Sequence, residues 1–363
     1  PVKIRLKKYY FLLTRTSFES RYTANGCRLA MKHLFNPEDI ERKVLLILKI
    51  LNENSESAGA RVIARKMKEH GVHLSERTVR YHLKSMDERG LTRLIGRRDG
   101  RIITDMGMEE INNARVRDKI SLSISRIDVL SLKTTFDIKK RRGLVPVNIS
   151  LFPQKQFRKA LAVMKPVFKK KIAVSDLVAV ASAGETLGEV TIPEGKIGFA
   201  TVCSILINGV LLKHGIPMDS KFGGILQVRH GNPLRFVELI NYSGSSLDPS
   251  EIFIRGKMTS VKDVVKKGEG KILANFREIP ALALSLVENI VADFKKIGVN
   301  GALSIGNVGN PVCQTNVDIN KVGMILLGGL NPIAAAGEEG FDIENKAMST
   351  VMEYETLQRV EDI

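Results

Sequence analysis

The stretch SERTVRYHLKSMDERG, residues 75–90, predicts a short amphipathic helix with well-defined ends. Ser75 is a residue type that caps helix N-termini, and Gly90 is placed to end the helix in a left-handed turn. Val79, Leu83 and Met86 recur at helical spacing and predict a buried stripe. The opposite face carries Arg77, Thr78, Arg80, Tyr81 and Lys84. Because such a face suits the major groove of duplex DNA, we take these five residues and Ser75 as candidate DNA contacts.

The segments on either side of this helix predict a winged helix-turn-helix. One helix is expected to begin near Pro37, and a second is expected over about residues 58–70. Residues 91–95 and 101–104 predict two short strands around a glycine-bounded turn, and Thr104 is expected to cap a further helix. The hairpin carries three arginines that we expect to contact phosphates or a minor groove, namely Arg97, Arg98 and Arg101.

The charge of the chain supports a polyanionic partner for this module. The 363 residues include 56 Lys+Arg against 39 Asp+Glu, a formal net charge of +17. Residues 1–120 alone hold 26 basic and 15 acidic side chains, so the excess is concentrated at the winged helix. Neutralising phosphates releases condensed counterions, which favours binding of a basic module to nucleic acid.

Cysteine usage and hydropathy indicate a cytoplasmic protein. The three cysteines, Cys27, Cys203 and Cys313, are far apart in the sequence, so we expect no zinc site. Such sparse cysteines are typical of a protein in a reducing compartment. No apolar run reaches the roughly 18 residues of a membrane span, so no membrane partner is expected. We expect residues 1–36 to form a loosely ordered tail and assign them no function.

The region after residue 134 contains an internal duplication. The motif Gly143, Asn148, Pro153 recurs at spacings near 127 residues, and similar helices and apolar strands follow each copy. The sequence therefore predicts a multidomain α/β (α+β) fold, in which an N-terminal winged helix-turn-helix precedes an internally duplicated, two-lobed α/β effector domain. The expected ranges are 37–113 for the winged helix, 114–134 for a linker, 135–245 for the first lobe and 246–363 for the second.

A cleft between two lobes is a common place for a small ligand, and we expect a small-anion effector there. Glycine-rich loops follow apolar strands in both halves, although neither matches a P-loop. His214 and Lys213 break the repeat, and Lys221 lies close behind them. The candidate effector-binding residues are Ser182, Gly184, Thr186, Cys203, Ser204, Asn208, Lys213, His214, Lys221, Ser304, Gly306 and Asn307.

Several stretches resemble the archaeal nitrogen regulatory repressors of the NrpR family. They are SERTVRYHL at 75–83, TTFD at 134–137, GFATVCS at 198–204 with Asn208 and Gly209, and KHGIPMDSKFGG at 213–224. The resemblance runs from about Ile40 to the end of the sequence. It implies a homodimeric repressor of nitrogen-fixation and nitrogen-assimilation genes that binds palindromic operators. It also implies that 2-oxoglutarate, a dicarboxylate, lowers the affinity for DNA. Some members carry two effector domains, whereas this chain has one.

Two other functions remain open on the sequence alone. The duplicated lobes could enclose the catalytic cleft of an enzyme acting on a small keto acid or anion, which the winged helix would hold near nucleic acid. Alternatively, the winged helix could be an adaptor for RNA or protein. The sequence shows no acid–base pair, no nucleophile with its base and no metal-ligand set, so we expect no catalytic residues and no cofactor other than the allosteric ligand.

Overall fold

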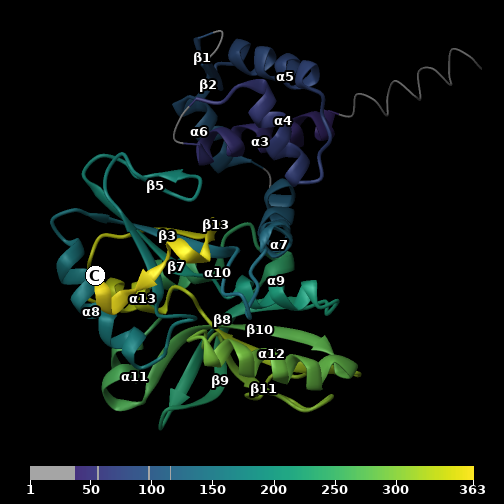
Figure 1. Cartoon of the computed structure of the whole chain (residues 1–363). Helices are drawn as coiled ribbons and strands as arrows, with labels where there is room; N and C mark the ends of the chain where they lie inside the picture. The colour runs from purple at the N-terminus through teal and green to yellow at the C-terminus, as the bar shows by residue number, and fades with distance from the viewer. Residues whose placement is uncertain (1–36, 55–56, 97–98, 115) are drawn as a thin grey trace, which may run out of the picture.

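The structure, a computed structural model, describes residues 37–54, 57–96, 99–114 and 116–363. A small helical domain stands above a larger region built on two sheets, and one helix connects them (Figure 1). The expected tail, residues 1–36, and the hairpin arginines Arg97 and Arg98 lie outside the described residues.

The small domain has the predicted elements of a winged helix in the predicted order, which confirms that part of the fold. Its helices are α3 (Pro37–Glu53), α4 (Ala60–Glu69) and α5 (Glu76–Glu88). The hairpin strands β1 (Thr92–Gly96) and β2 (Gly100–Ile103) follow, and then comes α6 (Asp105–Asn113).

Local chemistry explains where these helices begin. The Ser75 hydroxyl accepts a hydrogen bond from the Thr78 N–H (3.2 Å), and the Thr104 hydroxyl accepts one from the Gly107 N–H (3.1 Å). Each bond satisfies one of the otherwise unpaired donors of a first helical turn. The predicted stripe of α5, Val79, Leu83 and Met86, is buried in the core of the small domain.

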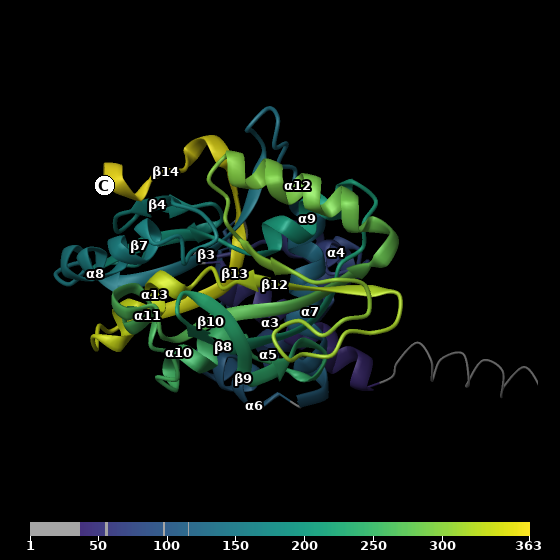
Figure 2. The ribbon, with the colours of Figure 1, turned by 90° about the horizontal axis from the view of Figure 1, so that it is seen from below.

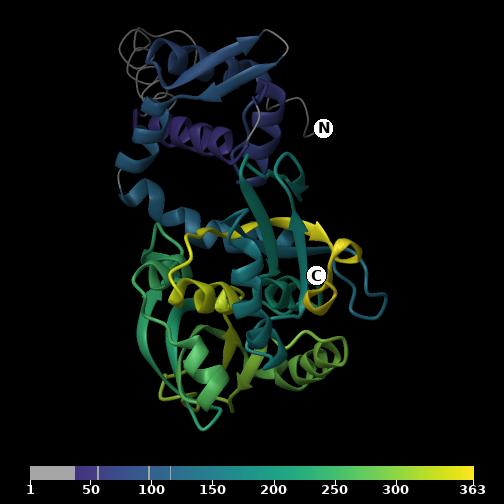
Figure 3. The same cartoon turned by 90° about the vertical axis from the view of Figure 1, so that its left-hand side faces the viewer.

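The range expected as a linker is occupied by the helix α7 (Val116–Lys133). Its later residues pack against α9, where Gly209 lets the two helices approach closely. A Cβ built on Gly209 would lie 2.4–2.8 Å from side-chain atoms of the fully buried Thr134. The connection is therefore a packed helix and not a free tether (Figure 3).

The predicted duplication is present as two runs of the same six elements. The first run is β3 (Leu144–Pro153), α8 (Phe157–Lys169), β4 (Leu177–Ala181), β7 (Lys196–Val202), α9 (Ile205–Lys213) and β8 (Asp219–Arg229). The second is β10 (Gly270–Pro280), α12 (Leu284–Lys296), β11 (Ala302–Ile305), β12 (Lys321–Leu327), α13 (Asn331–Glu338) and β13 (Glu344–Glu353). The other α-helices and strands of this region are β5 (Thr186–Leu187), β6 (Val190–Thr191), β9 (Asn232–Asn241), α10 (Pro249–Arg255), α11 (Val261–Lys267) and β14 (Gln358–Arg359).

The two repeats exchange their last strands. One sheet has the order β13-β3-β7-β4-β14 and the other β11-β12-β10-β8-β9, so β13 pairs with β3 and β8 pairs with β10 (Figure 2). The sheets therefore do not coincide with the expected lobe ranges 135–245 and 246–363. The first sheet takes its two edge strands, β13 and β14, from the second range, and the second sheet takes β8 and β9 from the first range. All of these strand pairs are antiparallel, which is typical of an α+β architecture.

One irregularity in the exchanged strand β13 positions the site described below. Its register with β3 shifts between Lys346 and Thr350, and Met348 within this bulge has a left-handed backbone (φ 50°). The Met348 N–H donates to Asn148 Oδ1 (3.0 Å), which fixes the bulge against β3. A single hydrophobic core includes buried residues from both sheets, so the two repeats form one folded unit.

Strand exchange predicts that neither half folds alone. A fragment of residues 135–245 lacks β10 and β13, which flank its strands β8 and β3, and should give no cooperative thermal unfolding transition by circular dichroism. A fragment of residues 116–363 should unfold cooperatively. A cooperative transition in the 135–245 fragment would contradict the mutual dependence of the two sheets.

Candidate DNA-binding surface and effector cavity

The candidate DNA-binding surface is the outward face of α5. Arg77, Arg80, Tyr81 and Lys84 are exposed there, and Thr78 is half-buried. Tyr81 leaves 70 % of its surface open, although its ring contacts that of His82 edge-on. Arg80 pairs with Glu76 (3.1 Å) within the same helix, but an exposed pair of this kind contributes only about 0–1 kcal/mol and can be exchanged for a phosphate contact.

Arg101 does not share this surface. Its Nε donates to Asp87 Oδ2 (2.7 Å), while the Thr92 hydroxyl donates to Asp87 Oδ1 (2.6 Å). The guanidinium is mostly buried and holds the hairpin against the C-terminal end of α5. The guanidinium that the sequence predicted to contact a phosphate is thus held by Asp87 in this structure.

The glycine-rich loops predicted to hold an anion lie apart. Their candidate residues are Ser182, Gly184, Thr186, Ser304, Gly306 and Asn307. The first three lie in exposed backbone around β5, which extends from the first sheet towards the winged helix. Ser304 lies in β11, the edge strand of the second sheet, and Gly306 and Asn307 follow it at the far end of the region (Figure 1). Because the loops extend from different sheets, they do not build one site.

The predicted basic cluster is also divided. Lys213 and His214 end α9 and line a surface pocket that includes Asp137 and Asp293. Lys221 lies in β8, where its ammonium contacts the carboxylates of Asp219, Glu278 and Asp318 at 2.9–3.0 Å. Hydrogen bonds to Asp219 and Asp318 raise the pKa of Lys221, so its charge is already balanced within the protein.

Cys203 and Ser204, by contrast, line an interior cavity where the two repeats meet. Its volume is about 20 Å³, enough for roughly one water molecule. Asn208 lies one helical turn further along α9 and donates to the Ser220 hydroxyl (3.2 Å). The cavity walls come from corresponding places in both repeats. The lining residues are Asn148, Cys203, Ser204, Ile205, Tyr242, Asp248, Ser250, Asn275, Arg277, Gly329, Leu330, Ala347 and Met348.

The most unusual lining residue is Arg277. Only 1 % of its surface is exposed, and its Nε and Nη1 have no hydrogen-bond partner within the described part of the chain. Its guanidinium lies 4.8 Å from the ring centroid of Tyr242. Asp248 lines the same cavity, but its carboxylate accepts from the N–H groups of Ser250 (2.8 Å) and Glu251 (3.2 Å). A buried cation without a paired anion is costly, and the position therefore fits a bound carboxylate.

Sequence reasoning missed Arg277, although a signal was present. Asn148 of β3 corresponds to Asn275 of β10, so Ser150 corresponds to Arg277. A charged residue that replaces a small one inside an otherwise buried strand is not required by the fold. The same argument applied to the repeat-breaking His214, but the exposed His214 lies outside the cavity.

Burial sets the protonation of the groups around Arg277. It raises the pKa of the Cys203 thiol to about 11, so Cys203 is a neutral thiol near pH 7 and not a reactive thiolate. Burial also raises the pKa of Tyr242 and of Asp248. The Tyr242 hydroxyl donates to Asn275 Oδ1 (2.5 Å), and the Asn275 amide donates to the Ser204 hydroxyl (3.2 Å). The cavity thus has a cation and several neutral hydrogen-bonding groups.

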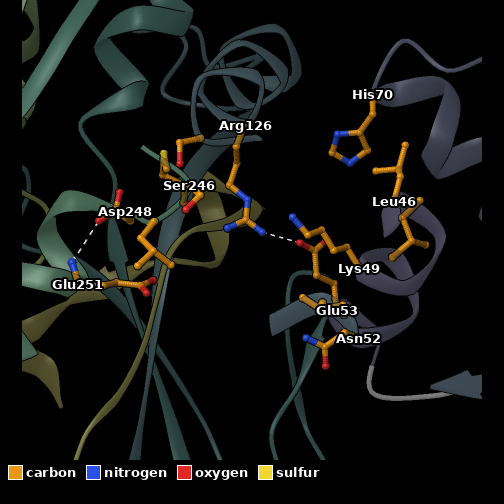
Figure 4. A pocket seen from close by; sticks show the side chains of 14 residues that line it. Leu46, Lys49, Asn52, Glu53, His70, Arg126, Ser246, Asp248 and Glu251 are labelled. Atoms are coloured by element: carbon orange, nitrogen blue, oxygen red, sulfur yellow. Dashed lines mark hydrogen bonds and ion pairs between the residues drawn. The ribbon is translucent and has the colours of Figure 1, made fainter. Parts of the chain in front are cut away.

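A second pocket, of about 240 Å³, lies between the winged helix and the duplicated region (Figure 4). Lys49, Glu53 and His70 face it from the winged helix, and Arg126 of α7 and Asp248 face it from the other side. Arg126 and Glu53 form an ion pair across the gap. Burial lowers the pKa of His70, so this side chain is neutral at pH 7.

The interior cavity and this interdomain pocket share a wall. Asp248 and Met348 line both of them. Residues of α7 and of the cavity also form one small hydrophobic cluster, in which Ile127 and Leu130 are buried together with Cys203, Tyr242 and Met348. The cavity wall is therefore in direct contact with the helix that carries the winged helix.

The hairpin of β5 and β6 makes a second connection to the winged helix. Glu189, between the two strands, pairs with Lys66 of α4 (3.2 Å) and lies 4.0 Å from Lys133 of α7. Lys133 also pairs with Glu69 (2.6 Å). Burial opposes ionisation of Glu189, but the charges of Lys66 and Lys133 outweigh it and hold the pKa of Glu189 below its ordinary value. This hairpin, predicted as an anion loop, thus contacts the winged helix.

The described residues form neither a metal site nor a membrane-spanning helix. No group of three or more His, Cys, Asp or Glu side chains is arranged to hold a metal ion there. None of the helices in those ranges is long and apolar enough to cross a bilayer.

Comparisons with known proteins agree with this arrangement. Residues 120–359 match the family described as NrpR regulatory domains NRD1 and 2, and residues 45–111 match the Ribonuclease R winged-helix domain. A solved structure of a nitrogen repressor-like protein from Methanococcus jannaschii is similar, with a TM-score of 0.56 and 29 % identity. The match covers 66 % of this chain and 98 % of that one.

Curated relatives cover most of the chain. The Global nitrogen regulator NrpRI of Methanosarcina mazei is 39 % identical over 321 residues, which are 88 % of this chain and 98 % of the relative. Proteins named Global nitrogen regulator NrpR from Methanocaldococcus jannaschii and Methanococcus maripaludis are 32 % and 31 % identical. The matches span 56 % and 54 % of those two longer proteins.

The Glu189 contact predicts how firmly the winged helix is held. Glu189→Lys replaces attraction to Lys66 and Lys133 with repulsion, so limited proteolysis within residues 114–122 should become about fivefold faster, as expected for about 1 kcal/mol. Adding Lys66→Glu should recover part of the protection. Glu194→Lys is a matched change at an exposed carboxylate near the same hairpin, and the protease should cleave this variant at the wild-type rate. Equal rates for Glu189→Lys and Glu194→Lys would contradict a holding role for the contact.

Proposed function

The chain belongs to the NrpR family of nitrogen regulators, and from this premise we propose that it is a homodimeric repressor that binds palindromic operator DNA and releases it when 2-oxoglutarate binds. Membership of the family makes the chain a nitrogen-related transcriptional regulator and not an enzyme. The binding of operator DNA, the homodimer and the release by 2-oxoglutarate are proposals that go beyond family membership. The observation that carries the allosteric part is the buried Arg277, which forms no ion pair with a described residue and lines a cavity whose wall packs against α7.

The DNA-binding part of the proposal rests on the exposed face of α5. In a winged helix-turn-helix, the helix after the turn lies in the major groove, and two copies in a dimer read two half-sites. Arg77 and Arg80 are long, exposed donors suited to guanine edges or phosphates, and Lys84 is suited to a phosphate. Tyr81 adds an exposed aromatic ring with a hydroxyl donor.

The effector part rests on chemical fit at the interior cavity. One carboxylate of 2-oxoglutarate would pair with Arg277, and the Ser204 hydroxyl and Asn275 amide offer neutral hydrogen bonds beside it. A dicarboxylate is much larger than the one water that about 20 Å³ admits. Binding therefore requires the walls to separate.

The wall that can separate is also the wall that faces the winged helix. Asp248 and Met348 lie between the cavity and the interdomain pocket, and Met348 packs with Ile127 of α7. In the proposed mechanism, ligand entry displaces this wall, α7 shifts, and the two winged helices of a dimer no longer match the half-site spacing. A ligand can change DNA affinity only through such a difference between two states.

The DNA-binding proposal predicts the effect of removing two cations. The double variant Arg77→Ala with Arg80→Ala should lose about 1–3 kcal/mol of operator affinity for each arginine that contacts a base. Each arginine that contacts a phosphate should lower the slope of log K against log salt by about 1. Gel shifts over a salt series measure both. The matched double variant Arg158→Ala with Lys159→Ala removes two exposed cations from α8 and should bind normally. Wild-type binding by the α5 variant would reject this DNA-binding surface.

The effector proposal predicts a different phenotype for Arg277→Met. Replacing a buried unpaired charge with an apolar side chain of similar length should keep or raise the melting temperature. Release of operator DNA should then need about tenfold more 2-oxoglutarate or more, because a charge-assisted hydrogen bond is lost. Asn307→Ala, in a loop away from the cavity, should respond like the wild type. A normal 2-oxoglutarate response in Arg277→Met would place the effector elsewhere while leaving DNA binding intact.

A further inference from the structure

A large groove separate from the effector cavity lies between the C-terminal ends of α8 and α12. Its volume is about 760 Å³, within the range of cavities that hold nucleotide-sized or drug-sized ligands. The segments that follow the two helices meet beside it, where Ser175 and Val299 form an antiparallel bridge. The lining residues are Ala162, Lys165, Pro166, Phe168, Lys169, Lys171, Ala173, Ser175, Asp176, Lys295, Gly298, Asn300, Val360 and Glu361.

The groove has an excess of positive charge. Four lysines line it against two carboxylates, those of Asp176 and Glu361. Lys165 donates to the Ile363 carbonyl oxygen (3.4 Å). The other three, Lys169, Lys171 and Lys295, are exposed and form no ion pair with any residue in the described ranges. These ammonium groups are therefore available to an anion.

The backbone of Lys171 indicates that its position is not a general requirement of the fold. Lys171 follows α8 in a left-handed conformation (φ 57°), and its N–H bonds to the Phe168 carbonyl (2.8 Å). The corresponding residue after α12 is Gly298 (φ 82°), whose N–H bonds to the Lys295 carbonyl (3.2 Å). Glycine adopts this conformation without strain, whereas lysine does not. The first repeat therefore has a lysine with a strained backbone at the position where the second repeat has an unstrained glycine.

Helix electrostatics do not account for this lysine. Cations are common in the last turn of a helix, where they complement the carbonyl end of the helix dipole, and this explains Lys169 and Lys295. Lys171 lies beyond the cap, at a position where glycine would end the helix equally well. Backbone strain of this kind is typical of residues that contact a ligand.

The floor of the groove is apolar. Phe168 and Val360 are buried there, and Pro166 and Ala173 lie beside them. An apolar floor with a lysine rim fits a ligand that has a flat, weakly polar part and several phosphates. Lysine is a common phosphate ligand because its ammonium acts as a mobile point charge.

We propose that this groove binds a nucleoside polyphosphate, with the base against the Phe168 floor and the phosphates among Lys169, Lys171 and Lys295. The site lies on helices α8 and α12 and shares no lining residue with the effector cavity. It goes beyond the proposed response to 2-oxoglutarate and gives the regulator a second small-molecule input.

Calorimetric titration of the full chain with ATP, without divalent metal and at about 0.15 M salt, tests the proposal. Wild type should bind one ATP per chain, and inorganic tripolyphosphate should compete with it. Lys171→Gly should weaken ATP binding about fivefold or more while its melting temperature stays equal or rises, because the strain is relieved. Lys159→Ala, on the same helix but away from the groove, should bind ATP like the wild type.

Three results would overturn the proposal. The first is no ATP binding by the wild type. The second is equal ATP affinity in Lys171→Gly and Lys159→Ala, which would leave Lys171 as a helix-end residue only. The third is displacement of ATP by 2-oxoglutarate, with loss of that displacement in Lys171→Gly, which would make the groove the effector site. None of these results depends on operator binding, so they separate this proposal from the repressor proposal.

Discussion

The packing of Ile127 and Leu130 against Cys203, Tyr242 and Met348 is the interaction on which the arrangement of the molecule depends. These two α7 side chains are buried on residues that enclose the interior cavity, so the helix that carries the winged helix has no independent position. A flexible tether would leave the two parts free to move separately. A packed helix instead joins the winged helix to the residues that enclose the cavity.

Strand exchange places that wall at the centre of the duplicated region. Because β8 and β13 each complete the sheet of the other repeat, neither repeat can move as a rigid lobe that opens away from its sibling. The parts of the wall outside the regular strand pairing are the bulge around Met348 and the segment that leads to Asp248. Both contact the buried guanidinium cavity on one side and the interdomain pocket on the other. Among the described residues no carboxylate forms an ion pair with the buried Arg277, and the proposed effector would supply one.

Sequence patterns predicted the parts of the fold that depend on neighbours in the chain. The caps at Ser75 and Thr104 and the apolar stripe of α5 are local, and the duplication appears as repeated spacing. β8 and β13 could each pair with either of two similar strands, β3 or β10. The residue pattern within one strand does not indicate which of these partners it takes. For the same reason the sequence did not reveal the Asp87 contact of Arg101 or the position of Arg277 in the interior cavity. Both depend on residues brought together only by the tertiary structure.

Calorimetry tests the claim that cavity occupancy is transmitted through α7 most directly. 2-Oxoglutarate is titrated into free and operator-bound protein, for the wild type and for Ile127→Ala. Reciprocity requires the operator to weaken 2-oxoglutarate binding by the same factor as the effector weakens operator binding. The account predicts that this factor exceeds one in the wild type and falls towards one in Ile127→Ala, while the free variant still binds the effector. Equal affinities for free and operator-bound wild type, or an unchanged factor in Ile127→Ala, would contradict it.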